Sequence, residues 1–276
     1  MPGIDLYYRR PAPCMILSAV ASPWIIHRPN AARGLRLYCF AYAGGHAGVF
    51  APWQALLEPH VEVCGIQLPG RGARMREPAA ASFDTLITEI TRAIAGADDG
   101  RPFAFFGHSL GSLLAFEVAR GVRRMGHRLP MHLFLSGSEP AAYRSPGPAL
   151  HLMSDDALVR ELAAFNGTPM EVLANREMML LLLPMLRADF GLVHGYRYQS
   201  ALPLDIPFSV LAGRRDDRGS GIDVSLWGEE STVGSELRWF EGDHFFINSH
   251  QREVVDYVRE RMFATLGMAV GGGSLP

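Results

Sequence analysis

The chain has 276 residues, of which 48% are hydrophobic, and its 26 basic and 28 acidic residues give a formal net charge of −2. Every basic residue is arginine, and the absence of lysine excludes a Schiff-base enzyme, a Walker A nucleotide-binding loop and a serine–lysine hydrolase. The near-neutral charge gives no whole-molecule attraction to nucleic acid or to an anionic membrane, so neither is expected as a partner.

The two ends of the chain differ in composition from the region between them. Residues 1–34 are rich in proline, alanine and arginine and are predicted to form a poorly ordered leader, with Met15 as an alternative start to Met1. The apolar stretch in this leader is short and is interrupted by Ser18, which disfavours a secretion signal. Residues 267–276 contain three consecutive glycines and are predicted to be a flexible tail.

Strand-like and helix-like segments alternate between these ends. Short apolar runs predict strands, and amphipathic spacing predicts helices, the second of them capped by Ser82. The predicted strands cover residues 35–40, 61–68, 103–106, 132–135, 208–212 and 237–240, and the predicted helices cover 49–58, 83–95, 110–125 and 252–263. This order predicts one α/β domain over residues 35–266, with a mostly parallel central sheet and helices on both faces.

The stretch from 154 to 198 breaks the alternation because its pattern is helical throughout. Gly167, Pro169 and Pro184 divide it into about three predicted short helices. A helical insertion between two strands is typical of a lid, so we predict a lid over residues 150–200. Plain core packing of the apolar run 178–183 is the alternative reading, and that run is too short to span a bilayer.

The segment Gly107-His108-Ser109-Leu110-Gly111 matches G-x-S-x-G and lies between a predicted strand and a predicted helix. In that context the serine occupies a sharp, strained turn, and the two glycines stand where side chains would collide. The turn places the serine oxygen at the N-terminus of the following helix, where developing negative charge is favoured. Ser109 is therefore the predicted nucleophile of an α/β-hydrolase fold.

A serine hydroxyl needs a base and an orienting acid, and in this fold class the chain order is serine, acid, histidine. His244 follows the last predicted strand and is the predicted base. Asp216 and Asp217 both follow the strand 208–212, and the spacing from Gly213 favours Asp216.

The oxyanion hole of such a site needs two backbone N–H donors. Leu110, the residue after the nucleophile, is predicted to supply one of them. The loop 41–45, rich in small residues, is predicted to supply the other from Ala43.

These motifs and their neighbours resemble the type II thioesterases of polyketide and nonribosomal peptide synthesis, over residues 35–263. The resemblance is carried by the nucleophile motif and by five further segments. Those are Phe40-Ala41-Tyr42-Ala43-Gly44-Gly45, Gln67-Leu68-Pro69-Gly70-Arg71-Gly72-Ala73-Arg74, Phe165-Asn166-Gly167-Thr168-Pro169, Leu183-Pro184-Met185-Leu186-Arg187-Ala188-Asp189-Phe190 and Gly242-Asp243-His244-Phe245-Phe246. The chain departs from the family pattern at Ala41, usually proline, and at His46, usually serine.

The resemblance implies a cytoplasmic, monomeric serine thioesterase without metal or other cofactor. Such an enzyme hydrolyses acyl groups from the phosphopantetheine arm of an acyl or peptidyl carrier protein, in editing or in release. A general carboxylesterase or lipase-like hydrolase, and a carrier-binding module without catalysis, are the alternatives.

Carrier proteins are typically acidic, and arginine suits carboxylate and phosphate partners. Arginines that follow two predicted strands should lie on the face that bears Ser109. We predict carrier docking by Arg71, Arg74 and Arg76, and the same reasoning extends to Arg214, Arg215 and Arg218.

Overall fold

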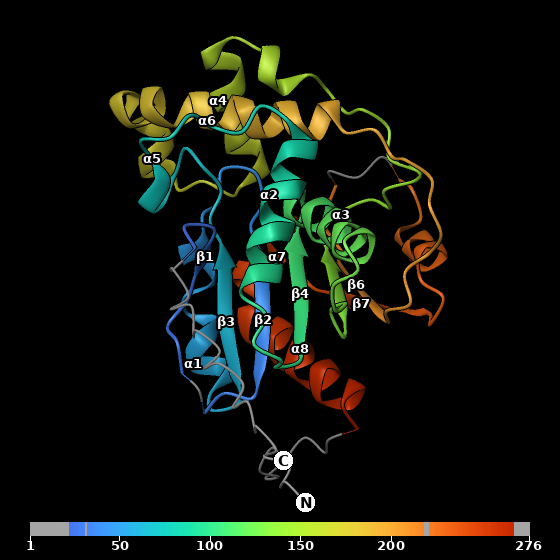
Figure 1. Ribbon diagram of the computed structural model, residues 1–276. Coiled ribbons are helices and arrows are strands. Elements are labelled where there is room, and N and C mark those ends of the chain that lie inside the picture. The colour runs from blue at the N-terminus through green and yellow to red at the C-terminus, as the bar shows by residue number, and fades with distance from the viewer. Residues whose placement is uncertain (1–21, 31, 218–220, 268–276) are drawn as a thin grey trace, which may run out of the picture.

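The computed structural model describes residues 22–30, 32–217 and 221–267. The leader up to residue 21, with Met15 and Cys14, lies outside the described residues, as do Arg218 and the tail from 268. A seven-stranded sheet forms the centre, in the order β1-β3-β2-β4-β5-β6-β7 (Figure 1). The strands are β1 (Ile25–Ile26), β2 (Leu35–Phe40), β3 (Val61–Ile66), β4 (Phe103–His108), β5 (Leu133–Ser136), β6 (Phe208–Gly213) and β7 (Ser235–Phe240).

The six predicted strands correspond to β2 to β7, and all of them run parallel. The structure adds β1, which pairs antiparallel with β3 at the register Ile25↔Ile66. This strand falls inside the predicted leader, so ordered structure begins before residue 35. Two residues are too short a run to give a strand signal in the sequence.

Helices cover both faces of the sheet, as predicted for an α/β-hydrolase fold (Figure 1). Side chains of β2 alternate between the two cores: Tyr38 and Phe40 pack on one face, and Leu37 and Cys39 pack on the other. Cys64 on β3 is buried in the first core. The first face carries α2 (Phe83–Gly96) and α3 (Leu110–Arg124), and the second carries α1 (Trp53–Leu57), α7 (Phe246–Ser249) and α8 (Gln251–Thr265).

Local capping and short turns match the sequence pattern. Ser82 caps α2, since its Oγ accepts a hydrogen bond from the backbone N–H of Thr85 at 3.3 Å. The helix predicted over 49–58 is divided into a 3₁₀ turn and the short helix α1. The 3₁₀ turns are η1 (Ala47–Phe50), η2 (Gly72–Arg74), η3 (Leu150–Leu152) and η4 (Val224–Glu230).

The predicted lid consists of α4 (Asp155–Phe165), α5 (Met170–Ala174) and α6 (Arg176–Gly195), which lie across one end of the sheet (Figure 1). The sequence predicted that Pro184 ends a helix. In the structure Pro184 instead lies inside α6. A proline there removes one helical hydrogen bond, and the lid core formed by Leu183 and its neighbours offsets this loss. By length and composition alone α6 could span a membrane; here it packs over the site described below.

Candidate active site

Ser109 occupies the turn between β4 and α3 in a conformation that side chains rarely adopt. Its φ is 55° and its ψ is −117°. A Cβ added to Gly107 would lie 2.1 Å from the carbonyl oxygen of Gly111, and a Cβ added to Gly111 would lie 2.0 Å from that of Phe40. Only glycine permits this close backbone contact, which fixes the turn and presents Ser109 at the N-terminus of α3.

His244 and Asp216 are brought together although 28 residues separate them. His244 Nδ1 lies 2.8 Å from Asp216 Oδ2, and both side chains are largely withdrawn from solvent. Asp217 is exposed. Asp243, the direct neighbour of His244, instead accepts hydrogen bonds from Asn166 Nδ2 and from the backbone N–H of Phe245. Of the two candidate acids, Asp216 therefore has the geometry to orient the imidazole of His244.

His108, the neighbour of Ser109, is fully buried and packs in the protein interior. Its Nδ1 is 2.9 Å from Ser136 Oγ, and its ring centroid is 5.1 Å from that of His244. Burial, followed by the nearby His244, lowers the pKa of His108 well below its ordinary value. The His108 imidazole is therefore a buried packing group.

Loop 42–45 follows β2 and borders the site. Its Gly44 N–H donates to Asp189 Oδ2 at 2.7 Å, and its Gly45 N–H donates to the Tyr42 carbonyl at 2.9 Å. The N–H of Ala43 has no hydrogen-bond acceptor among the described residues. The N–H of Leu110, the first residue of α3, has no partner within its own helix. Ala43 also lines both cavities described below, and Leu110 directly follows Ser109.

Two cavities meet at Ser109. The smaller, of about 310 Å³, lies under the lid and has mostly apolar walls, including Leu162, Met179, Leu182, Met185 and Leu186. The larger, of about 750 Å³, has charged side chains in its walls, including Glu139, Arg144 and Asp216. Both are lined by Ala43, Ser109, Phe165, Phe190 and His244.

The stacked rings of Phe165 and Phe190 line both cavities, with centroids 6.1 Å apart. Phe165 ends α4 and Phe190 lies on α6, so both belong to the lid. Beyond the family resemblance, Phe165 and Phe190 carry no sequence signal of a site role, because the meeting of two lid helices over a serine leaves no local pattern.

The arginines predicted to dock a carrier divide into two groups. Arg71 is buried in an ion pair with Asp189, and Arg74 is buried against Glu77 with its guanidinium 3.9 Å from the ring centroid of Trp24. Neither guanidinium faces solvent, so their positions do not support docking. Both arginines follow the end of β3, and this position alone suggested that their side chains are exposed. They instead lie in a turn that folds back on itself and buries them. The exposed ones are Arg76, Arg214 and Arg215.

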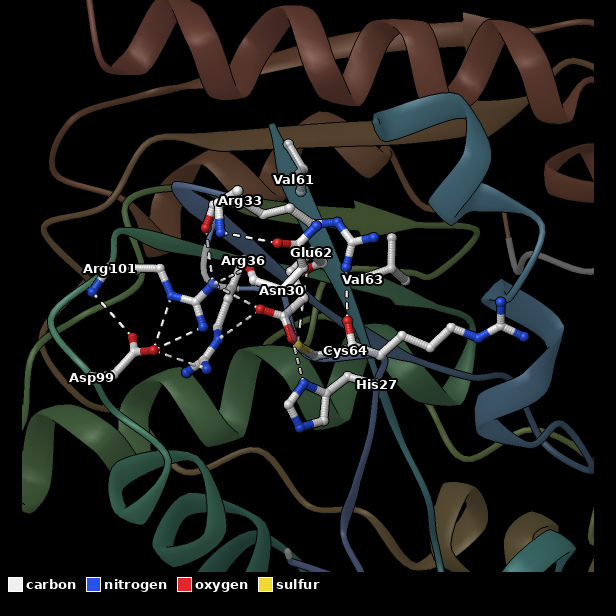
Figure 2. Close-up of polar contacts among 12 residues, drawn as sticks. His27, Asn30, Arg33, Arg36, Val61, Glu62, Val63, Cys64, Asp99 and Arg101 are labelled. Carbon is white, nitrogen blue, oxygen red and sulfur yellow. Dashed lines mark hydrogen bonds and ion pairs between the residues drawn. The ribbon is translucent and has the colours of Figure 1, made fainter. Parts of the chain in front are cut away.

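A second polar cluster surrounds Glu62, which is fully buried at the start of β3 (Figure 2). In the described ranges, His27, Glu62 and Cys64 are the one group of three possible metal ligands, with ligand atoms within 4.8 Å of one another. Glu62 Oε1 is already 2.5 Å from His27 Nδ1, and Oε2 is 2.8 Å from an Arg101 nitrogen and 3.6 Å from Arg36 Nε. Two guanidiniums beside the carboxylate oppose a divalent cation, so the cluster is a structural ion-pair network.

Glu62→Gln is expected to lower the free energy of unfolding at pH 7 by about 3 kcal/mol, because Arg36 and Arg101 would lose their buried carboxylate. Burial acts to raise the pKa of Glu62, but hydrogen bonds from His27 and Arg101 outweigh it and hold that pKa below its ordinary 4.5. A carboxyl with a lowered folded-state pKa stabilises the fold above its unfolded pKa, and this contribution is lost as the pH falls through the folded value.

The difference between wild type and Glu62→Gln should therefore shrink below pH 4.5. Urea unfolding followed by tryptophan fluorescence at a series of pH values measures it. Glu89→Gln is the control, because Glu89 pairs with Arg92 at the surface. This substitution should lower the free energy of unfolding by less than about 1 kcal/mol. Equal losses for the two variants, or a difference that persists at low pH, would contradict the prediction.

Known proteins provide an independent comparison. The family model for the thioesterase domain matches residues 35–262. Linear gramicidin dehydrogenase LgrE of Brevibacillus parabrevis is 35% identical, over 87% of this chain and 93% of that protein. Gramicidin S biosynthesis protein GrsT of Aneurinibacillus migulanus is 33% identical, over 90% and 97% respectively. The solved type II thioesterase BorB, from the borrelidin biosynthetic cluster, superposes with a TM-score of 0.80 at 30% identity, covering 87% of this chain and 97% of BorB.

The parallel sheet and the strained serine turn define an α/β-hydrolase. The chain belongs to the thioesterase family. Its resemblance to the type II thioesterases of polyketide and nonribosomal peptide clusters is confirmed.

Proposed function

We propose that the protein is a cytoplasmic, monomeric serine thioesterase that removes acyl groups from the phosphopantetheine arm of acyl or peptidyl carrier proteins, in editing or release. The observation that carries this proposal is the meeting of two cavities at one serine, beside a histidine held by Asp216. A thioester held across Ser109 would extend its acyl part and its thiol part in different directions. The smaller cavity has mostly apolar walls and the larger one also has charged side chains in its walls, which suits those two parts.

Acyl transfer to Ser109 is the first half of the proposed reaction. His244 takes the hydroxyl proton as Ser109 Oγ attacks the thioester carbonyl, and Asp216 keeps the imidazole oriented and stabilises its protonated form. The N–H groups of Ala43 and Leu110 stabilise the oxyanion. The C–S bond then breaks, and the proton passes from His244 to the departing sulfur, which leaves as the thiol of the arm.

Water completes the reaction. His244 removes a proton from the water molecule as its oxygen attacks the acyl-serine carbonyl, and the same oxyanion donors act again. The C–O bond to Ser109 breaks, the serine recovers its proton from His244, and the free acid departs. The apolar cavity suits the hydrocarbon part of the acyl group, and the larger cavity suits the amide groups of the arm.

The substrate preference tests this proposal. We expect kcat/KM for a butyryl-loaded carrier protein to exceed that for butyryl-CoA by about 10-fold or more, because the carrier adds contact surface that CoA lacks. Release of free thiol measures both reactions, and p-nitrophenyl butyrate serves as the oxygen-ester comparison. Arg76→Glu should lower the rate with the carrier and leave the rate with CoA unchanged, since Arg76 is exposed and the carrier is acidic.

Two outcomes would favour the alternatives. Strong turnover of p-nitrophenyl butyrate without any turnover of the loaded carrier would indicate a general esterase. Saturable binding of the loaded carrier without release of thiol would indicate a binding module.

A further inference from the structure

Asp189 joins the lid to the loops that follow β2 and β3 through a buried ion pair. It lies on α6, its side chain is 1% exposed, and its two oxygens each accept a hydrogen bond of 2.6 Å from the Arg71 guanidinium. Oδ2 also accepts the N–H of Gly44 at 2.7 Å. Arg71, itself buried, donates to the carbonyl of Gly45 at 3.2 Å. One buried ion pair therefore holds two consecutive residues of the loop that follows β2.

These bonds determine which N–H group of the loop remains available. The Gly44 N–H is directed to Asp189, and the Gly45 N–H to the Tyr42 carbonyl. Gly44 has a φ of 80°, and a Cβ there would lie 2.6 Å from Leu186 Cδ2 of α6, so the helix rests directly on the loop. With Gly44 and Gly45 engaged in this way, the neighbouring Ala43 N–H is the one with no acceptor among the described residues, and Ala43 lines both cavities that meet at Ser109.

We propose that Asp189 is a positioning residue for the oxyanion hole: by accepting the Gly44 N–H it fixes the loop so that the Ala43 N–H points to the reacting carbonyl. Arg71 is its partner, and neither residue touches the substrate. The inference rests on the proposed function in one respect, since it takes the Ala43 N–H as an oxyanion donor. Segments 67–74 and 183–190 are far apart in the chain, and both carry the family pattern. The proposed role of Asp189 accounts for this, since the two segments meet at the ion pair between Arg71 and Asp189.

The proposal makes the oxyanion hole depend on the lid. Asp189 belongs to α6, so the Gly44 N–H has its acceptor only when α6 rests on the loop. An N–H group that loses a buried acceptor turns toward another one, and the loop conformation changes with it. The hole is thus complete only when the lid is seated over the cavities.

A matched pair of double variants separates the hydrogen bond from the charge. Arg71→Met/Asp189→Asn and Arg71→Met/Asp189→Leu both remove the ion pair, and an apolar replacement of a buried ion pair is usually tolerated by the fold. Asparagine keeps an oxygen for the Gly44 N–H, whereas leucine, of similar size, has none. Arg71→Met/Asp189→Ala is a second variant without an acceptor. Asp155→Asn is the control, since Asp155 of α4 forms an exposed 2.6 Å ion pair with Arg187 of α6, the helix that carries Asp189.

Activity per active site is the measurement, with active sites counted by titration with a fluorophosphonate that labels Ser109. We expect kcat of the leucine and alanine variants to be about 10²-fold below that of the asparagine variant, with KM within about threefold, as for a misplaced oxyanion donor. The inhibition constant of a trifluoromethyl ketone, which forms a tetrahedral adduct with the serine, should rise in parallel. Asp155→Asn should match the wild type.

Equal kcat per titrated site in the asparagine and leucine variants would overturn the proposal. So would a loss of titratable sites with unchanged kcat per site, because that result would mean that Asp189 only stabilises the fold. The rates are measured with butyryl-loaded carrier protein and with p-nitrophenyl butyrate. If the wild type hydrolyses only the oxygen ester, the carrier function fails while the ester rates still test Asp189.

Discussion

Ser109→Ala is expected to lower kcat for thioester hydrolysis by about 10⁶-fold, the loss typical of removing the nucleophile of a serine triad. The alanine leaves His244 and Asp216 in place but removes the atom that attacks the carbonyl. The strained turn should persist, because Gly107 and Gly111 still make the close contacts that fix it. The variant should therefore still bind a butyryl-loaded carrier with little change in affinity, measured by calorimetry, while release of thiol stops.

Ser138→Ala is the matched control for this prediction. Ser138 lines the larger cavity, and its hydroxyl donates to the carbonyl of Glu139 rather than to a group of the proposed mechanism. It should change kcat by less than about threefold, as a substitution outside the reacting groups does. Carrier turnover that survives in Ser109→Ala would rule out the serine mechanism.

Asp216→Asn is expected to lower kcat by about 10⁴-fold, because an amide in place of the carboxylate favours the wrong tautomer of the imidazole. The 2.8 Å contact between His244 Nδ1 and Asp216 Oδ2 is the basis for this expectation. Steady-state rates on butyryl-pantetheine, which lacks the carrier, isolate the chemical step from docking.

Asp217→Asn provides the comparison, since Asp217 is the next residue and is exposed. It should stay within about threefold of the wild type. A larger loss for Asp217→Asn than for Asp216→Asn would assign the orienting acid to Asp217 instead.

Sequence pattern was sufficient for the elements whose signal is local. The strands β2 to β6 are mainly apolar, buried runs, and the serine turn is specified by two glycines at fixed spacing. The serine, acid, histidine order of the fold class then predicted the loops that carry Asp216 and His244, and the carboxyl ends of parallel strands meet at one edge of the sheet. The contact between those two side chains follows from that rule.

The features that sequence reasoning missed depend on distant partners. Arg71 follows a strand end and suggested an exposed cation, yet its partner Asp189 lies 118 residues away on the lid. Pro184 predicted a helix end, but the packing of the lid core keeps α6 continuous. The smaller cavity likewise takes part of its wall from lid residues such as Leu162 and Met185, and no spacing in the chain encodes that.

The burial of Cys39 and Cys64 in the two cores has a consequence for an enzyme that handles thioesters. A reachable thiolate would capture the acyl group by exchange and form a new thioester on the enzyme, so the acyl group would be relocated rather than released. Burial raises the pKa of Cys64 to about 12 and that of Cys39 well above its ordinary value, so both remain protonated. Neither lines the cavities that meet at Ser109. These two thiols are therefore unable to compete with Ser109 and water for the acyl group, and the acyl group leaves the enzyme as the free acid.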